Sequence, residues 1–110
     1  MNMNMADLFG KMMEMQQKLA EIQETVRQKQ VTVEAGGGMV QVTANGAREI
    51  IAIKIEPEAV NPEERELLED LVVAGVNKAL AEAERLAQEE MSKMAGSLLP
   101  PGMNLGQFGL

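Results

Sequence analysis

Two different periods of apolar and polar residues divide this chain of 110 residues. In the first part, apolar side chains recur at alternating spacings of three and four. These residues are Met5, Leu8, Met12, Met15, Leu19, Ile22 and Val26. Such a heptad stripe predicts a helix over about 6–29, roughly 35 Å long at ~1.5 Å per residue. Because the stripe needs an apolar surface to pack against, we expect a partner helix from this chain or from a second copy.

The middle of the chain changes to a period of two, which is the pattern of half-buried strands. It predicts strands at about 31–35, 39–44 and 48–55. The glycine triplet 36–38 separates the first two strands, and Asn45-Gly46 separates the second from the third. Both signals are typical of tight turns that use positive φ angles. We therefore expect a small antiparallel meander.

The alternation within these strands gives the sheet one clearly apolar face. Its expected members are Val31, Val33, Val40, Val42, Ile51, Ile53 and Ile55. The opposite face is expected to be mixed, because Met39, Ile50 and Ala52 fall on it. A sheet this small must have its apolar face covered by another element.

A second long helix is predicted over about 62–94. Asn61 is a good N-cap, and Pro62 suits the first helical position. Gly96 is a typical helix stop. The segment 97–110 is rich in Gly and Pro, which predicts a flexible tail.

The order α-β-β-β-α predicts an α+β fold in a single domain over 1–96. Its three-stranded antiparallel sheet is expected to be covered by the C-terminal helix, which Gly75 and many alanines allow to approach closely. The N-terminal helix is expected to protrude. The unshared heptad stripe and the partly apolar second face of the sheet predict a homodimer, with the seam formed by Leu8, Met12, Met15, Leu19, Ile22 and Val26.

Composition excludes several kinds of chemistry. The chain has no Cys and no His, so disulfides, the usual zinc and haem ligands, and Ser-His or Cys-His nucleophiles are absent. The glycine triplet lacks the Gly-Lys-Ser/Thr ending of a phosphate loop. Acidic residues at 63–70 are explained by a helix start with a solvated face. We expect no enzyme, no catalytic residue, no metal, no cofactor and no small-molecule substrate.

The chain also lacks the signatures of export and of membrane insertion. No basic segment followed by a long apolar run begins it, and no stretch approaches the ~18 apolar residues of a membrane span. We therefore expect a cytoplasmic protein that does not bind membranes.

The net charge of −7 is unevenly distributed. Acidic and basic side chains balance between 6 and 30, with four of each. Between 56 and 90, eleven acidic residues face only three basic ones. This distribution argues against non-specific nucleic-acid binding over the whole surface, and leaves a local basic strip on the first helix as a candidate.

At this point the sequence resembles the YbaB/EbfC family of nucleoid-associated proteins over nearly its full length. The resemblance rests on Met12-Met13-Glu14-Met15-Gln16-Gln17-Lys18, Gly37-Gly38-Met39-Val40-Gln41-Val42-Thr43-Ala44-Asn45-Gly46, Ile53-Lys54-Ile55-Glu56-Pro57, Glu69-Asp70-Leu71-Val72, Asn77-Lys78-Ala79 and Leu99-Pro100-Pro101-Gly102-Met103. It implies a small bacterial or organellar homodimer that binds double-stranded DNA and associates with the nucleoid. The first helices of such a dimer would project like the arms of tweezers.

The resemblance also implies where DNA would bind, namely the arm helix and the distal part of the last helix. By position, these sites are Lys11, Lys18, Arg27, Lys29, Arg85 and Lys93. The alternative for Lys11 and Lys18 is an exposed helix in which each lysine pairs with a glutamate three residues later. With no Trp or Tyr to stack on bases, single-strand recognition is not expected, and duplex binding would have weak sequence preference.

A protein-interaction adaptor or chaperone-like factor is the alternative function. The methionine-rich stripe would form an adaptable surface that grips an apolar segment of a partner protein. Partners that survive nuclease treatment would distinguish this function from DNA binding.

Overall fold

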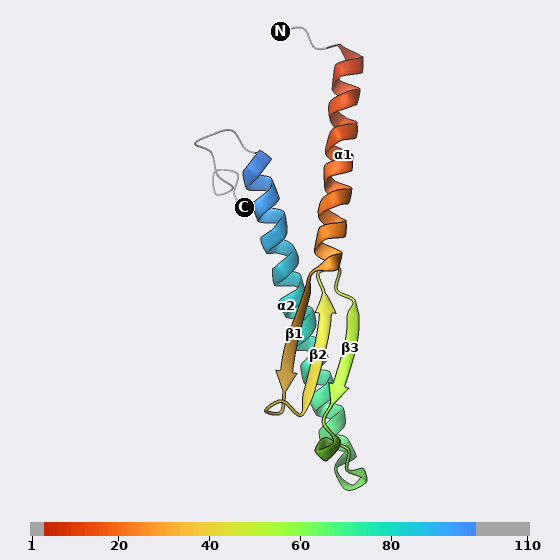
Figure 1. Cartoon of the computed structure of the whole chain (residues 1–110), viewed down its shortest axis with the longest axis vertical. Helices are drawn as coiled ribbons and strands as arrows, with labels where there is room; N and C mark the ends of the chain where they lie inside the picture. Colours follow the sequence, from red (N-terminus) through yellow and green to blue (C-terminus); the bar gives the residue numbers. More distant parts are fainter. Residues whose placement is uncertain (1–3, 99–110) are drawn as a thin grey trace.

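A computed structural model describes residues 4–98, which form two long helices and a three-stranded sheet (Figure 1). The elements in chain order are α1 (Met5–Gln28), β1 (Gln30–Ala35), β2 (Val40–Asn45), β3 (Ile50–Ile55), two 3-10 turns (Pro57–Ala59 and Pro62–Glu64) and α2 (Arg65–Leu98). The predicted α+β class and element order are confirmed. The predicted tail falls, from 99 onward, outside the described residues.

Helix α1 begins where the side chain of Asn4 accepts a hydrogen bond from the Asp7 N–H at 2.8 Å. This cap satisfies one of the N–H groups that the first turn leaves without a helical partner. Of the predicted heptad stripe, only Ile22 and Val26 are buried, at 5% and 7% exposure. They lie near the C-terminal end of the helix, so α1 is anchored at one end.

The sheet has the order β1-β2-β3 with both pairs antiparallel. Val42 in the central strand pairs with Val33 on one side and with Ile53 on the other. Directly paired residues share a face, so this register builds the expected apolar surface. Between β1 and β2, the three glycines adopt φ angles of +64°, +66° and +96°. The predicted glycine turn is therefore confirmed.

The pairing of β3 contains a bulge that the period of two did not predict. Thr43 pairs with Ala52, but Ala44 pairs with Ile50, so Ile51 is the extra residue. Ile50 consequently shares the face of Ala44, which is fully buried. The prediction that Ile50 lies on the opposite face was wrong, because one inserted residue reverses the alternation beyond it.

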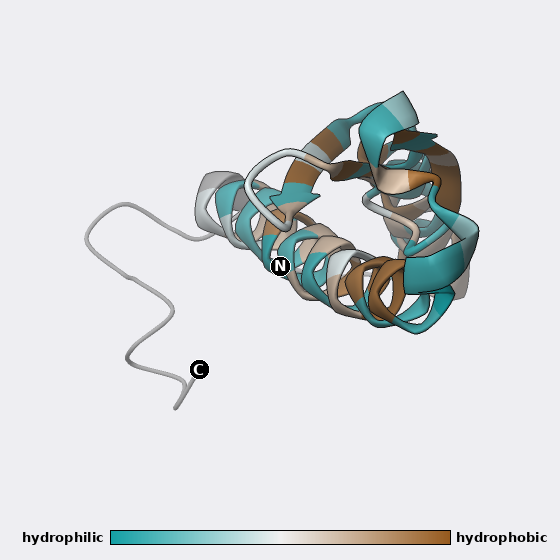
Figure 2. Ribbon diagram, turned by 90° about the horizontal axis from the view of Figure 1, so that it is seen from below, coloured by the Kyte–Doolittle hydropathy of each residue, from teal (hydrophilic) through white to brown (hydrophobic). Residues whose placement is uncertain are grey.

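Helix α2 covers the apolar face formed by β1 and β2. Val40 and Val42 are fully buried beneath it, together with its own Ala79 and Ala83. A Cβ atom on Gly75 would lie 2.8 Å from the Val42 side chain, so glycine is what permits this close approach. The sheet and the helix form two layers, with hydrophobic residues in both (Figure 2).

The cover stops short of β3. All six residues of that strand are exposed, including Ile51, Ile53 and Ile55 at 37–48%. Ile53 and Ile55 pair with the two fully buried valines of β2, so an uncovered apolar strip continues directly from the core.

Both ends of α2 differ from expectation. Asn61 caps the short 3-10 turn, accepting the Glu63 N–H at 3.0 Å, and the α-helix begins at Arg65. The helix then runs through Gly96 to Leu98, so the predicted stop was wrong. No atom lies within 4 Å of a Cβ placed on Gly96, and an exposed helical glycine costs only ~1 kcal/mol relative to alanine.

The connection between β2 (ending at Asn45) and β3 (beginning at Ile50) is longer than the tight turn that Asn45-Gly46 predicted. Gly46 is not in the left-handed region, and the residue with a positive φ, +63°, is Arg48. The side chain of Asn45 is buried and accepts the N–H groups of Ala47 and Glu49, each at 3.0 Å. Asn45 thus organises the loop through its side chain, and Gly46 serves a different purpose, the docking of α1.

Candidate nucleic-acid interface

The most prominent feature of the surface is the outer part of α1, which projects past the sheet as an arm (Figure 1). Every residue of this helix from 5 to 21 is exposed. We call residues 5–21 the arm and residues 22–29 its root. We call the sheet and α2 the body. The root is where α1 contacts the body, and the arm diverges from α2.

Two predicted DNA-binding residues, Lys11 and Lys18, lie on the arm and are exposed. Seven residues of α-helix separate them by about 10 Å along the axis and only ~20° around it, so both occupy one face. Among the described residues, no acidic group lies within ion-pair distance of either lysine. The expected alternative, local pairs with Glu14 and Glu21, is not what the structure has.

Arg27 belongs to the root and lies on the opposite face of α1 from Lys18. It follows Lys18 by nine residues, which is a rotation of about 180° around the helix. Its side chain lines a cavity of about 330 Å³ with Gly46 and Met91, and it has no ion pair within residues 4–98. Arg27 therefore does not extend the row formed by the two lysines.

The other three predicted residues are in ion pairs with α2 carboxylates. The Lys29 Nζ lies 2.6 Å from the Glu90 Oε1, and the Lys93 Nζ lies 3.5 Å from the same oxygen. Arg85 pairs with Glu82 at 3.1 Å and Glu89 at 2.9 Å. The Glu82 hydrogen bond is the main cause that raises the pKa of the Arg85 guanidinium. These cations are already neutralised locally.

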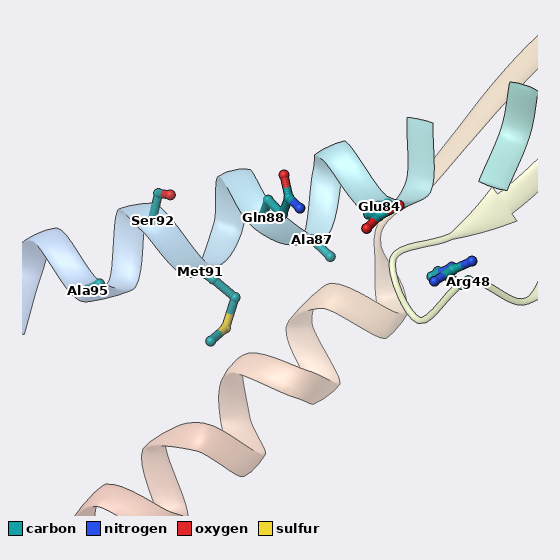
Figure 3. Close-up of a pocket in the computed structure, with 7 residues that line it drawn as sticks. All are labelled: Arg48, Glu84, Ala87, Gln88, Met91, Ser92 and Ala95. Carbon is teal, nitrogen blue, oxygen red and sulfur yellow. The ribbon is translucent and has the colours of Figure 1, made fainter. Parts of the chain in front are cut away.

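A cleft of about 690 Å³ opens where α1 and α2 diverge (Figure 3). Ala87, Met91 and Ala95 line its wall, while Arg48 lies on the loop across from Glu84. Sequence reasoning did not single out Arg48. The available signal was a basic residue two positions after the Asn45-Gly46 turn signal, which places it on an exposed loop.

Among residues 4–98, two runs of neighbouring apolar side chains are left uncovered. One is the β3 strip described above. The other runs along the arm and consists of Met5, Leu8, Phe9, Met12, Met13, Met15 and Leu19, at 45–84% exposure. Exposed apolar areas of this kind mark interaction surfaces.

Other kinds of site find no support in the described part of the chain. Between 4 and 98 there is no group of three acidic, His or Cys side chains arranged to hold a metal ion. Over the same residues, neither α1 nor α2 is apolar for long enough to cross a bilayer.

Comparison with known proteins decides the family. A profile of the YbaB/EbfC DNA-binding family matches residues 1–98. The chain belongs to this family. The resemblance noted from the sequence motifs is thereby confirmed.

Three relatives from bacteria match over almost their whole length. A nucleoid-associated protein of Pelotomaculum thermopropionicum is 41% identical, covering 91% of this chain and 95% of its own length. One of Desulfotalea psychrophila is 45% identical, covering 94% and 92%. One of Moorella thermoacetica is 43% identical, covering 90% and 95%.

A crystal structure supports the fold independently. Protein HP0035 from Helicobacter pylori superposes with a TM-score of 0.65, covering 90% of this chain and all of that one, at 23% sequence identity. This likeness shows a shared fold. The family is described as DNA-binding, and the three relatives above are named nucleoid-associated proteins.

Proposed function

We propose that this protein binds duplex DNA as a homodimer, through Lys11 and Lys18 of the projecting arms, with weak sequence preference, and associates with the nucleoid. Arg27 contributes from the opposite side of the root. The observation that carries the proposal is the contrast between the cations. Those of the arm have no acidic partner among the described residues, whereas Lys29, Arg85 and Lys93 are paired with carboxylates.

Local charge explains how an acidic chain can bind a polyanion. The acids are concentrated on the body, where eleven lie between 56 and 90. The arm carries its cations away from that region, past the end of the sheet (Figure 1). At physiological salt, charges more than ~8 Å apart are largely screened, so a phosphate at the arm is shielded from these acids and responds to the charges of the arm itself. Those charges are Lys11 and Lys18 together with Asp7, Glu14 and Glu21, so binding depends on the exposed face that the two lysines share.

Weak sequence preference follows from the kind of side chain involved. Lysine binds phosphate as a compact point charge, and phosphate contacts position a protein without reading the bases. The exposed face formed by Lys11 and Lys18 presents flexible ammonium groups rather than a planar fork for a base edge. The protein is therefore suited to coating or compacting duplex DNA.

The dimer in this proposal is supported by the two uncovered apolar surfaces. The β3 strip continues the core at an edge of the sheet, and a second copy would bury it by presenting the same strip. Light scattering is expected to give twice the 12.0 kDa chain mass at micromolar concentration.

An Ile53→Glu variant tests which surface forms the dimer. Ile53 belongs to the strip, whereas Lys54, the next residue, points to the other face of the same strand. We expect Ile53→Glu to shift the mass towards the single chain and Lys54→Glu to leave it unchanged. A dimer that tolerates Ile53→Glu would exclude the β3 strip as the interface.

Fluorescence anisotropy of a labelled duplex of ~30 base pairs, titrated across ~50–300 mM salt, tests DNA binding directly. We expect strong binding at low salt and a log–log slope of several units, because each neutralised phosphate contributes about −0.9. Absence of binding at the lowest salt would show that the net charge of −7 dominates, and the proposal would fail.

The exposed methionines of the arm favour one second candidate, a protein-interaction adaptor. Met12 and Met15 are each 61% exposed, and methionine forms adaptable binding surfaces. In a pull-down treated with nuclease, retained protein partners would support the adaptor. Recovery of DNA complexes alone, all lost on nuclease treatment, would support the first proposal.

A further inference from the structure

The root of the arm is buried at Ile22 and Val26, and a short ion pair joins its end to α2. Glu90 is only 9% exposed, and its Oε1 lies 2.6 Å from the Nζ of Lys29, the residue that ends α1. The two residues are 61 positions apart in the chain. Lys93 of α2 lies 3.5 Å from the same oxygen, so the shorter contact from Lys29 is the one that joins the two helices. A short, charge-assisted hydrogen bond at a nearly buried carboxylate favours this joined arrangement over an open one.

A second attachment joins the root to the loop between β2 and β3. The N–H of Gly46 donates to the carbonyl oxygens of Val26 and Lys29, each at 3.1 Å. A side chain at Gly46 would collide with Val26, so only glycine permits this contact. The loop therefore fixes where α1 ends, while Lys29 and Glu90 hold that end against α2.

These attachments are confined to the root, so the arm behaves as a lever. Lys11 lies eighteen residues before Lys29, which is about 27 Å along a helix. A swing of ~10° at the root would move Lys11 by roughly 5 Å. This displacement is longer than a hydrogen bond, so it would break a contact between Lys11 and a phosphate. Small changes at the root thus decide where the lysines of the arm lie.

We infer that Glu90 is a positioning residue, which holds Lys29 and thereby sets the direction in which the arm leaves the body. We call the ion pair between Lys29 and Glu90 the brace. In this inference Lys29 serves the brace and does not contact DNA. The consequence for DNA rests on the proposed function, but the brace itself is a property of the folded chain. A buried carboxylate thereby has a structural role in a member of a DNA-binding family, although DNA carries the same sign of charge.

The brace can be measured without DNA. The chain has no cysteine, so spin labels at Gln16→Cys on the arm and Ala81→Cys on α2 report one defined distance. Mixing the labelled protein with an excess of unlabelled protein ensures that the measured distance is the one between the two labels of a single chain. In Glu90→Gln we expect the distribution to broaden or to shift by roughly 3 Å for each 10° of swing.

Two further variants make this measurement decisive. The matched control is Glu66→Gln, which removes the same charge from an exposed site in the first turn of α2 and should leave the distance unchanged. The exchange Lys29→Glu with Glu90→Lys, made together with Lys93→Gln so that the new lysine faces no neighbouring ammonium group, should restore the distribution, because it rebuilds the pair with opposite polarity. An unchanged distribution in Glu90→Gln, or an exchange that folds but does not restore the distance, would overturn the inference.

Duplex titrations separate the brace from DNA contact. Losing a phosphate contact in each chain of a dimer makes the salt slope shallower by about 2, whereas losing only the arm direction lowers affinity at an unchanged slope. We expect the second result for Glu90→Gln and for Lys29→Gln. A shallower slope in Lys29→Gln would show that Lys29 contacts DNA. If the arm moves but no version of the protein binds duplex, the proposed function fails and the brace stands.

Discussion

Replacing Lys11 and Lys18 together with glutamine is the sharpest test of the arm as a DNA-binding element. The change removes two exposed charges that share one helix face and have no acidic partner among the described residues. Glutamine and lysine have similar helix propensities, so we expect the fold and the helix content by circular dichroism to be unchanged. The effect on DNA is therefore a direct measure of these two charges.

The size of the effect follows from counting contacts. Two lysines in each chain make four phosphate contacts in a dimer, and each contributes about −0.9 to the slope of log affinity against log salt. Losing all four makes the slope shallower by between 3 and 4 units, about 0.9 for each contact. At ~0.1 M salt each contact is worth a little under one power of ten, so the affinity falls by roughly 10³- to 10⁴-fold.

The assay is anisotropy of a labelled duplex, and the control is the double variant Arg65→Gln and Lys78→Gln. This control removes the same number of positive charges from α2, where Arg65 pairs with Glu69 at 3.2 Å and Lys78 donates to the Glu34 carbonyl at 3.4 Å. We expect its slope to equal that of the unaltered protein. Equal losses in both variants, or an arm variant with an unchanged slope, would refute arm-specific phosphate contact.

Three further predictions concern stability. In urea unfolding, Gly46→Ala should destabilise by about 1–3 kcal/mol, because its Cβ would overlap Val26. Gly10→Ala should stabilise by about 0.5–1 kcal/mol, because no atom lies within 4 Å of the added Cβ and alanine favours the helix. The hydrogen bond from Lys29 lowers the pKa of Glu90 despite burial, so their pair contributes fully above the ordinary glutamate pKa and is lost as pH falls through the lowered value. Acid unfolding of Lys29→Gln should lack this component, and an unchanged acid transition would contradict it.

The sequence predicted the elements well because their signals are local. The heptad stripe set α1, and the glycine triplet set the first turn with the expected positive φ angles. The errors concern residues whose roles depend on distant parts of the chain. Gly46 was interpreted as a turn glycine, yet the requirement for glycine there comes from Val26, twenty positions earlier.

The candidate site also contains features that the sequence could predict and features that it could not. The exposure of Lys11 and Lys18 follows from their place on a projecting helix, which the apolar stripe already indicated. The pairing of Lys29 with Glu90 does not follow, because it depends on how α2 passes the root of α1. The bulge at Ile51 was equally inaccessible, since a period of two does not reveal where one residue is inserted.

The one-sided attachment of α1 also has a thermal consequence. With residues 5–21 all exposed, the helix of the arm depends on its own sequence, and an isolated helix of that length is marginal in water. Heating a single chain should therefore unwind the arm from its tip while the sheet beneath α2 stays intact. A ligand that needs the helical arm must offset the conformational entropy that is lost when the arm rewinds. Its binding should therefore weaken with temperature well before the body unfolds.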